Sequence, residues 1–187
     1  LTPDAGVRLR DAESVLSPDG RTIYSSFAKP LANADSRSVL VAIDVATGTR
    51  TVLLDTENLS YFPGPVSPDN RTLVVLSESD TTPVAAPQVK LHLLDVSGPA
   101  TGESALTPLA HDWDRWARPA AWLPDGSALL VTADEDGASP VFRIGVAGDT
   151  GGAGQVTRLT ADAAAYTDVV VAPDGLNAYA LRSSYEF

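Results

Sequence analysis

The sequence predicts an all-β fold made of repeated four-stranded blades, namely a β-propeller fragment of about three and a half blades. Three observations predict it. A short turn motif occurs four times at nearly even spacing, and each copy is followed by a strand-like run. Helical periodicity of three to four residues is not sustained anywhere in the 187 residues. Together these features favour blades over an α/β arrangement.

The turn motif is Ser-Pro-Asp-Gly or a near variant of it. Its copies begin at Ser17, Ser67, Leu123 and Ala172, with steps of 50, 56 and 49 residues. Such a step is too long for most helical repeats and is typical of four-stranded propeller blades, which run at about 40 to 50 residues. The spacing predicts blade units at about 8–54, 60–107 and 117–160, and an incomplete unit at 166–187.

The residue types of the motif suit a tight turn. Pro presets φ at about −65° in the second position, Asp tolerates the bridge region, and the fourth residue must adopt a positive φ. Gly fills the fourth position in three copies and Asn70 fills it in the second. Because Asn enters the left-handed region more readily than most residues, we expect the same turn in all four copies.

The strands are expected at fixed places relative to each motif. The runs that follow it, expected to be second strands, are 22–24, 72–76, 128–132 and 178–181. Third strands are expected at 39–44, 89–95 and 141–146, and outer strands are expected to end at Leu54, Thr107 and Thr160, after turns at 46–48, 97–98 and 148–154. Leu1-Thr2 fits the end of a preceding unit, so we expect an internal fragment of a longer protein.

The third strand at 89–95 shows alternation. Val89, Leu91 and Leu93 fall on one face of this strand, whereas Lys90 and His92 fall on the other. This pattern predicts one buried face and one exposed face. We therefore expect His92 to be a solvated or cross-strand histidine and not a catalytic base.

The composition excludes several classes of partner. Thirteen Lys and Arg against 24 Asp and Glu give a net charge of −11, which repels phosphate backbones and anionic lipids. No window approaches the roughly 18 consecutive apolar residues of a membrane span. We expect neither a nucleic-acid nor a membrane partner. The absence of cysteine excludes disulfides and leaves the compartment open, with the cytoplasm favoured.

The repeat resembles those of two groups of propellers. The repeat consists of Ser-Pro-Asp-Gly, as at 17–20, a hydrophobic strand, a second strand ending in Asp plus Thr-Gly, and a strand ending in Leu-Thr. This order resembles the propellers of the prolyl oligopeptidase family of serine peptidases, which includes the acylaminoacyl and dipeptidyl peptidases, and the periplasmic Tol-system propeller. The runs 140–144 and 180–185 look more like the acylaminoacyl peptidase type. Departures are Asn70, Leu123 and Ala172 within the motif, and Gly145 where other units have Asp44 and Asp95.

The resemblance implies a non-catalytic role. In that peptidase family the propeller caps a separate α/β-hydrolase domain and limits access to short peptides. The implied partners are the remainder of the same propeller, the catalytic domain and short peptides. The alternative is a non-enzymatic protein-interaction propeller of the Tol-system or WD type. Open blade edges further predict self-association.

No catalytic centre, metal site or cofactor is expected in this chain. The nucleophile elbow Gly-x-Ser-x-Gly does not occur, and Gly102-Glu103-Ser104 leads into an expected outer strand as a loop. The run 134–137, Asp-Glu-Asp-Gly, lacks the ligand spacing of a calcium loop and is expected to be an acidic hairpin tip. The glycine-rich run 148–154 follows a strand without opening a helix, so it is expected to be a turn and not a phosphate cradle.

Two groups of residues are candidates for substrate or interface binding. The first lies between two blades and contains His111, Trp113, Arg115, Trp116 and Arg118. Trp and Arg are common hot-spot residues, and loops on a rigid scaffold often bind ligands. The second group, at the end of a second strand, is Arg182, Ser183 and Ser184.

Each group also has a purely structural interpretation. Trp113, Trp116 and Trp122 would cover a seam between blades, with Arg115 and Arg118 paired to Asp112 and Asp114. The second group would be a plain exit from its strand. By blade topology, the Trp/Arg segment is expected to share its face of the propeller with 27–37, 78–88 and 133–139.

Overall fold

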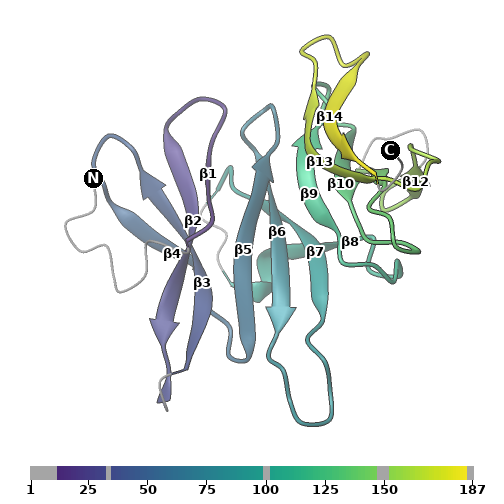
Figure 1. The fold of residues 1–187 in the computed structure, drawn as a ribbon. Coiled ribbons are helices and arrows are strands. Elements are labelled where there is room, and N and C mark those ends of the chain that lie inside the picture. Colours follow the sequence, from purple (N-terminus) through teal and green to yellow (C-terminus); the bar gives the residue numbers. More distant parts are fainter. Residues whose placement is uncertain (1–11, 33–34, 99–101, 147–151, 185–187) are drawn as a thin grey trace. The chain divides into compact units, whose positions relative to one another are not determined.

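The computed structural model describes residues 12–32, 35–98, 102–146 and 152–184, and within them the chain is all-β (Figure 1). These residues form three four-stranded antiparallel sheets and one two-stranded sheet, and in each sheet the strands follow one another in chain order. These are propeller-like blades, so the predicted fold class is confirmed. The chain divides into two compact units, residues 1–107 and 108–187, which are described separately.

The first unit holds two sheets. The strands of the first are β1 (Ser14–Leu16), β2 (Thr22–Pro30), β3 (Ser36–Asp44) and β4 (Arg50–Leu54). Those of the second are β5 (Leu59–Val66), β6 (Thr72–Ser79), β7 (Val89–Asp95) and β8 (Leu106–Leu109), the last of which runs into the second unit. A short 3-10 helix, η3 (Glu103–Ala105), leads into β8, so Ser104 lies in a turn before an outer strand, as expected.

The second unit holds the other two sheets. One consists of β9 (Arg118–Trp122), β10 (Ala128–Thr132), β11 (Val141–Gly145) and β12 (Val156–Arg158). The other is the pair β13 (Ala165–Val171) and β14 (Ala178–Ser183), in which every residue of β14 is exposed. Large apolar side chains at Val170, Leu176, Tyr179 and Leu181 are exposed on this pair.

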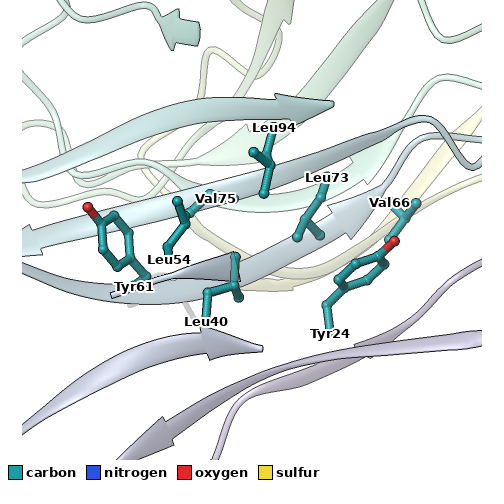
Figure 2. Packing of buried hydrophobic residues seen from close by; sticks show 8 residues of the cluster. All are labelled: Tyr24, Leu40, Leu54, Tyr61, Val66, Leu73, Val75 and Leu94. Atoms are coloured by element: carbon teal, nitrogen blue, oxygen red, sulfur yellow. The ribbon is translucent and has the colours of Figure 1, made fainter. Parts of the chain in front are cut away.

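The core of the first unit lies between its two sheets (Figure 2). Its members come from β2 to β7 and are Tyr24, Leu40, Leu54, Tyr61, Val66, Leu73, Val75 and Leu94. Burying one such side chain stabilises the fold by about 1.5–3 kcal/mol. This cluster therefore packs the two sheets of the unit together.

The expected alternation of β7 is wrong: on the face predicted to be buried only Leu91 is buried, whereas Val89 and Leu93 are half-buried. Leu94 lies on the same face as Lys90 and His92, yet it is completely buried and belongs to the core. The reason is that Leu94 pairs with Leu73 on β6, and both face the first sheet. His92 is half-buried, and its Nε2 lies 2.8 Å from the Ser77 hydroxyl across the sheet, as expected for a cross-strand histidine.

The four repeat turns share one geometry. In each copy the backbone amide of the fourth residue donates to the carbonyl of the first at 2.9 Å. The fourth residue has a positive φ in every copy: 72° at Gly20, 61° at Asn70, 73° at Gly126 and 71° at Gly175. The predicted turn chemistry is confirmed, including the substitution of Asn for Gly.

The expected preceding unit at Leu1-Thr2, the glycines at 148 and 151, and Tyr185 lie outside the described residues.

Candidate functional site

A pocket of about 360 Å³ lies within the second unit, between β9 and β13. Strand β9 contributes Arg118, Pro119 and Ala120, and β13 contributes 165–169. Thr132 and Ser139 complete the lining. Small-ligand sites measure about 300–1,000 Å³, so this pocket suits a small group or one side chain of a larger ligand.

The position of the pocket follows from the pairing of the strands around it. Strands β9 and β13 are each the first strand and one edge of their sheet. Ser139 forms a parallel bridge with Ala165: its amide donates to the Ala164 carbonyl at 3.1 Å, and its carbonyl accepts from the Tyr166 amide at 3.0 Å. This bridge joins the two sheets beside the pocket, while Leu130, Val141 and Val169 pack beneath it.

Strand β13 is irregular where it lines the pocket. Its register with β14 passes from Thr167 opposite Leu181 to Val170 opposite Tyr179, and the two residues between them form a bulge. Asp168 has a φ of 52° there, and its Oδ2 accepts a hydrogen bond of 2.9 Å from the Thr167 hydroxyl. Bulges redirect side chains, and this one places an acidic residue at the pocket.

Arg118 and Asp134 form a two-point ion pair at the rim. The Arg118 Nη1 and Nη2 atoms lie 3.3 and 3.1 Å from the Asp134 Oδ1 and Oδ2 atoms. The Ser139 hydroxyl also donates to Asp134. The hydrogen bond from Ser139, followed by that from Arg118, lowers the pKa of Asp134. A carboxylate held in this way is a weak base, so the contact does not activate Ser139 as a nucleophile.

The acidic hairpin beside the pocket is built as expected. Asp136 and Gly137 have φ values of 50° and 79°, and the flanking Glu135 and Ala138 pair with each other. The Glu135 carboxylate lies between two arginines, 2.7 Å from Arg158 Nη1 and 3.5 Å from Arg115 Nη2. The tip of this hairpin is therefore a tight turn held to its surroundings by ion pairs.

Another ion pair supports the β13 side of the pocket. Asp162 accepts a hydrogen bond of 2.8 Å from the Tyr166 hydroxyl and another of 2.8 Å from Arg182 Nε. Arg182, followed by Tyr166, lowers the pKa of Asp162. Arg182 Nη1 also donates to the Ser184 hydroxyl at 3.2 Å. This network holds the hydroxyl of Tyr166, which is one of the residues that line the pocket.

The Trp/Arg segment divides between structural and exposed positions. Trp113 is half-buried and packs edge-on against the buried Phe142, with ring centroids 4.8 Å apart, so it has a structural role in this unit. Trp116 is 54% exposed. His111 is half-buried, and only Arg118 of the segment lines the pocket.

The ion-pair partners expected within the segment are wrong. Arg118 pairs with Asp134 and Arg115 with Glu135, whereas Asp114 contributes only its backbone carbonyl to Arg115. The reason is strand pairing: Arg118 lies opposite Thr132, which brings the hairpin carboxylates closer than the neighbouring ones in sequence. The segment does lie against 133–139, one of the loops expected on its face.

Of the second candidate group, Arg182 and Ser184 take part in the Asp162 network, while Ser183 ends β14 in an exposed position. The sequence reasoning missed Thr132, Ser139, Tyr166 and Asp168. The sequence contained a signal for two of them, Ser139 and Asp168. Ser139 ends the run Gly137-Ala138-Ser139, a second Gly-x-Ser, and Asp168 interrupts a β-rich run in the way a bulge residue does.

In the part of the chain that the structure describes, no helix is long and apolar enough to cross a bilayer. Within the same residues, no three side chains of His, Cys, Asp or Glu gather in a way that could hold a metal ion.

Comparisons with known proteins show the fold. No family model matches the sequence, and no curated protein matches it. Among solved structures, TolB from Acinetobacter baumannii is 21% identical with a TM-score of 0.63, over 94% of this chain and 38% of that one. A putative TolB from Agrobacterium tumefaciens is 19% identical with a TM-score of 0.64, over 94% of this chain and 55% of that one.

A peptidase is also similar in fold. The acylaminoacyl peptidase from Pyrococcus horikoshii is 14% identical with a TM-score of 0.58, over 87% of this chain and 22% of that one. The chain thus spans 38% and 55% of the two TolB chains. Its fold is that of a β-propeller, and the structures with a similar fold divide between TolB propellers and peptidase propellers.

Proposed function

We propose that this chain is a non-catalytic recognition segment of a β-propeller protein and that it holds extended peptide segments. The observation that carries the proposal is the pocket between β9 and β13, whose walls are mainly apolar and whose rim carries a few polar groups. This mixture is typical of sites that bind a ligand through one buried side chain and orient it by hydrogen bonds.

A peptide suits the pocket better than a compact small molecule. Both flanking strands are edges of their sheets, and edge strands offer backbone groups to an extended chain. Pro119 removes one donor from β9, and the Tyr166 amide of β13 already donates to Ser139, so the peptide would pair with the part of β13 that follows Tyr166. Tyr166 and Arg118 provide the kind of anchors that peptide interfaces use.

The same geometry argues against chemistry at this pocket. The Ser139 hydroxyl donates to a carboxylate whose pKa is lowered, and Asp134 is in turn held by Arg118. The sequence also lacks a Gly-x-Ser-x-Gly elbow. We therefore expect the chain on its own to bind peptides and not to hydrolyse them.

The first candidate for the parent protein is a serine peptidase of the acylaminoacyl peptidase kind. The chain would then be a partial propeller that gates peptide access, with the rest of the propeller and an α/β-hydrolase domain as partners. The resemblance of the repeat turns and the similarity in fold to the Pyrococcus horikoshii enzyme support this candidate.

The second candidate is an interaction propeller of the Tol-system type. It is favoured by the similarity to the two TolB structures, which covers more of this chain at higher TM-scores than the similarity to the peptidase. The sequence of the parent polypeptide distinguishes the candidates. A Gly-x-Ser-x-Gly elbow outside these 187 residues supports the peptidase, and blades without an elbow support the interaction propeller.

Binding itself is tested with blocked peptides and the isotope-labelled chain. We expect amide chemical shifts to move for the residues lining the pocket and for few others. Ala120→Leu, which fills the pocket from β9, should weaken binding, whereas Ala121→Leu on the same strand, outside the pocket lining, should not. Shifts that cluster elsewhere on the chain, or an absence of shifts with every peptide, would refute the proposal without relying on either variant.

A further inference from the structure

We infer that the pocket selects a basic side chain, Lys or Arg, of the bound peptide, and that Asp168 is the anion that recognises it. The inference rests on the proposed function and adds the chemical class of the ligand.

Asp168 differs from the other carboxylates around the pocket. Asp134, Glu135 and Asp162 are each ion-paired with at least one arginine. Asp168 lines the pocket and accepts a hydrogen bond from Thr167, but none of the described cations forms an ion pair with it. Its charge is therefore available to a ligand.

The lining cation does not favour an anionic ligand. Arg118 directs both Nη atoms to the Asp134 carboxylate, which compensates its charge. A second negative group would compete with Asp134 for the same donors. The uncompensated charge at the pocket is thus the negative one of Asp168.

The walls fit the long stem of a basic side chain. Pro119, Ala120 and Val169 present apolar surface, and Tyr166 adds an aromatic side chain whose hydroxyl is already held by Asp162. Lys and Arg bury their methylene stems on such surface while the charged end reaches a polar partner. Aromatic rings add a further attraction for cations.

A metal ion fits this donor set poorly. Calcium requires six to eight oxygen ligands, and a single carboxylate supplies too few. An ammonium or guanidinium group needs only one carboxylate beside an apolar wall. The net charge of −11 also attracts basic peptides over a distance, so binding should weaken with added salt.

The test uses blocked pentapeptides, Ac-Ala-Ala-X-Ala-Ala-NH2, with X as Lys, norleucine or Glu, and calorimetry on the chain. The Lys peptide should bind about fivefold more tightly than the norleucine peptide, the size expected of a partly exposed ion pair. Asp168→Asn should abolish this preference. The matched control is Asp136→Asn, because Asp136 is also exposed and has a φ of 50°, yet lies outside the pocket lining. It should leave the preference unchanged.

The outcomes separate this inference from the proposed function. Equal affinity for the Lys and norleucine peptides overturns the charge selection and leaves peptide binding intact. Tightest binding of the Glu peptide also overturns it, because Arg118 would then be the recognising group. If both Asn variants lose the preference for the Lys peptide, the preference arises from the net charge of the chain. That outcome overturns the role of Asp168. If no peptide binds, the proposed function fails as well.

Discussion

The backbone amide of Asp19 donates a hydrogen bond of 2.9 Å to Oδ1 of Asn70, which joins the repeat turns of two successive blades. Asn70 is the residue that replaces Gly in its turn. Its side chain therefore does more than tolerate a positive φ, because it also ties its turn to the preceding one. Glycine at this position would supply the φ without the bond.

We predict that Asn70→Gly destabilises the chain by about 1 kcal/mol, the net value of one hydrogen bond, although Gly suits the backbone better. Asn70→Ala should cost about 1–2 kcal/mol more, since Ala is strained in the left-handed region. Urea denaturation measures both. A variant Asn70→Gly as stable as the wild type would show that the bond contributes nothing.

The serines that open the first two turns should stabilise them in the same way. Ser17 Oγ accepts from the Thr22 amide at 3.0 Å and donates to Asp19 at 2.7 Å, and Ser67 repeats both bonds at 2.9 and 2.6 Å. Both serines are buried. We predict that Ser17→Ala or Ser67→Ala costs about 1–2 kcal/mol in urea denaturation.

The fourth turn provides the reverse experiment. Ala172 occupies the position of these serines, and its amide already bonds to the Asn177 carbonyl at 2.8 Å, as Ser17 does to Thr22. Ala172→Ser should raise the stability of the second unit, because the new hydroxyl can bond to Asp174 and to the Asn177 amide. If both the Ala and the Ser substitutions leave stability unchanged, the hydroxyl is not a determinant of the turn.

The sequence predicted those parts of the fold that are determined by residues close together in the chain. The turn at Ser17 to Gly20 depends on four consecutive residues, so its conformation can be predicted from the sequence alone. The pocket is different, because it needs β9 and β13, whose facing residues Ala120 and Tyr166 are far apart in the chain. The bulge that positions Asp168 depends on how β13 pairs with β14. The hydrophobic periodicity of one strand gives no information about its pairing with another. The error over Arg118 has the same origin, since a cross-strand partner replaced a sequence neighbour.

Acid should remove a defined part of the stability of the first unit. Asp55 is paired with Lys29 at 2.7 Å and with the buried Arg37, which also donates to the Thr56 carbonyl at 2.7 Å. Lys29 first, and then Arg37, lower the pKa of Asp55. A carboxylate with a lowered pKa in the folded state stabilises it above the unfolded pKa of about 3.9, and this contribution is lost as the pH falls through the folded value.

Asp55→Asn should therefore cost about 1 kcal/mol at pH 7, a value reduced for the partial exposure of Asp55, and progressively less below pH 4. Denaturation of both proteins at pH 7 and pH 3 measures the difference. Asp35→Asn is a control, because Asp35 is exposed and its carboxylate accepts a hydrogen bond from an uncharged donor, the Ser36 backbone amide. A cost for Asp55→Asn that is equal at both pH values would contradict the ion-pair explanation.

The open edge at β14 should promote self-association. Tyr179 and Leu181 are 63% and 66% exposed on an edge strand, which is the kind of surface that pairs with another chain. We predict that the apparent mass in light scattering rises with concentration and that Leu181→Lys reduces the rise. Val84→Lys replaces an exposed apolar residue that lies in a turn and not on an edge strand, so it should change the rise less. A monomer at all concentrations would exclude this mode.

Substituting the two tryptophans of the 111–118 segment singly should separate folding from binding. Trp113 packs edge-on against Phe142, so Trp113→Ala should destabilise the second unit by about 2 kcal/mol or more. Trp116 is 54% exposed, and Trp116→Ala should change stability by less than about 0.5 kcal/mol.

If the segment contacts the ligand, Trp116→Ala should still weaken peptide binding, as seen by calorimetry. A double variant would mix the two effects, because loss of binding would then follow from unfolding alone. Unchanged affinity in a folded Trp116→Ala protein would show that Trp116 does not contact the peptide. The binding surface would then be the pocket alone.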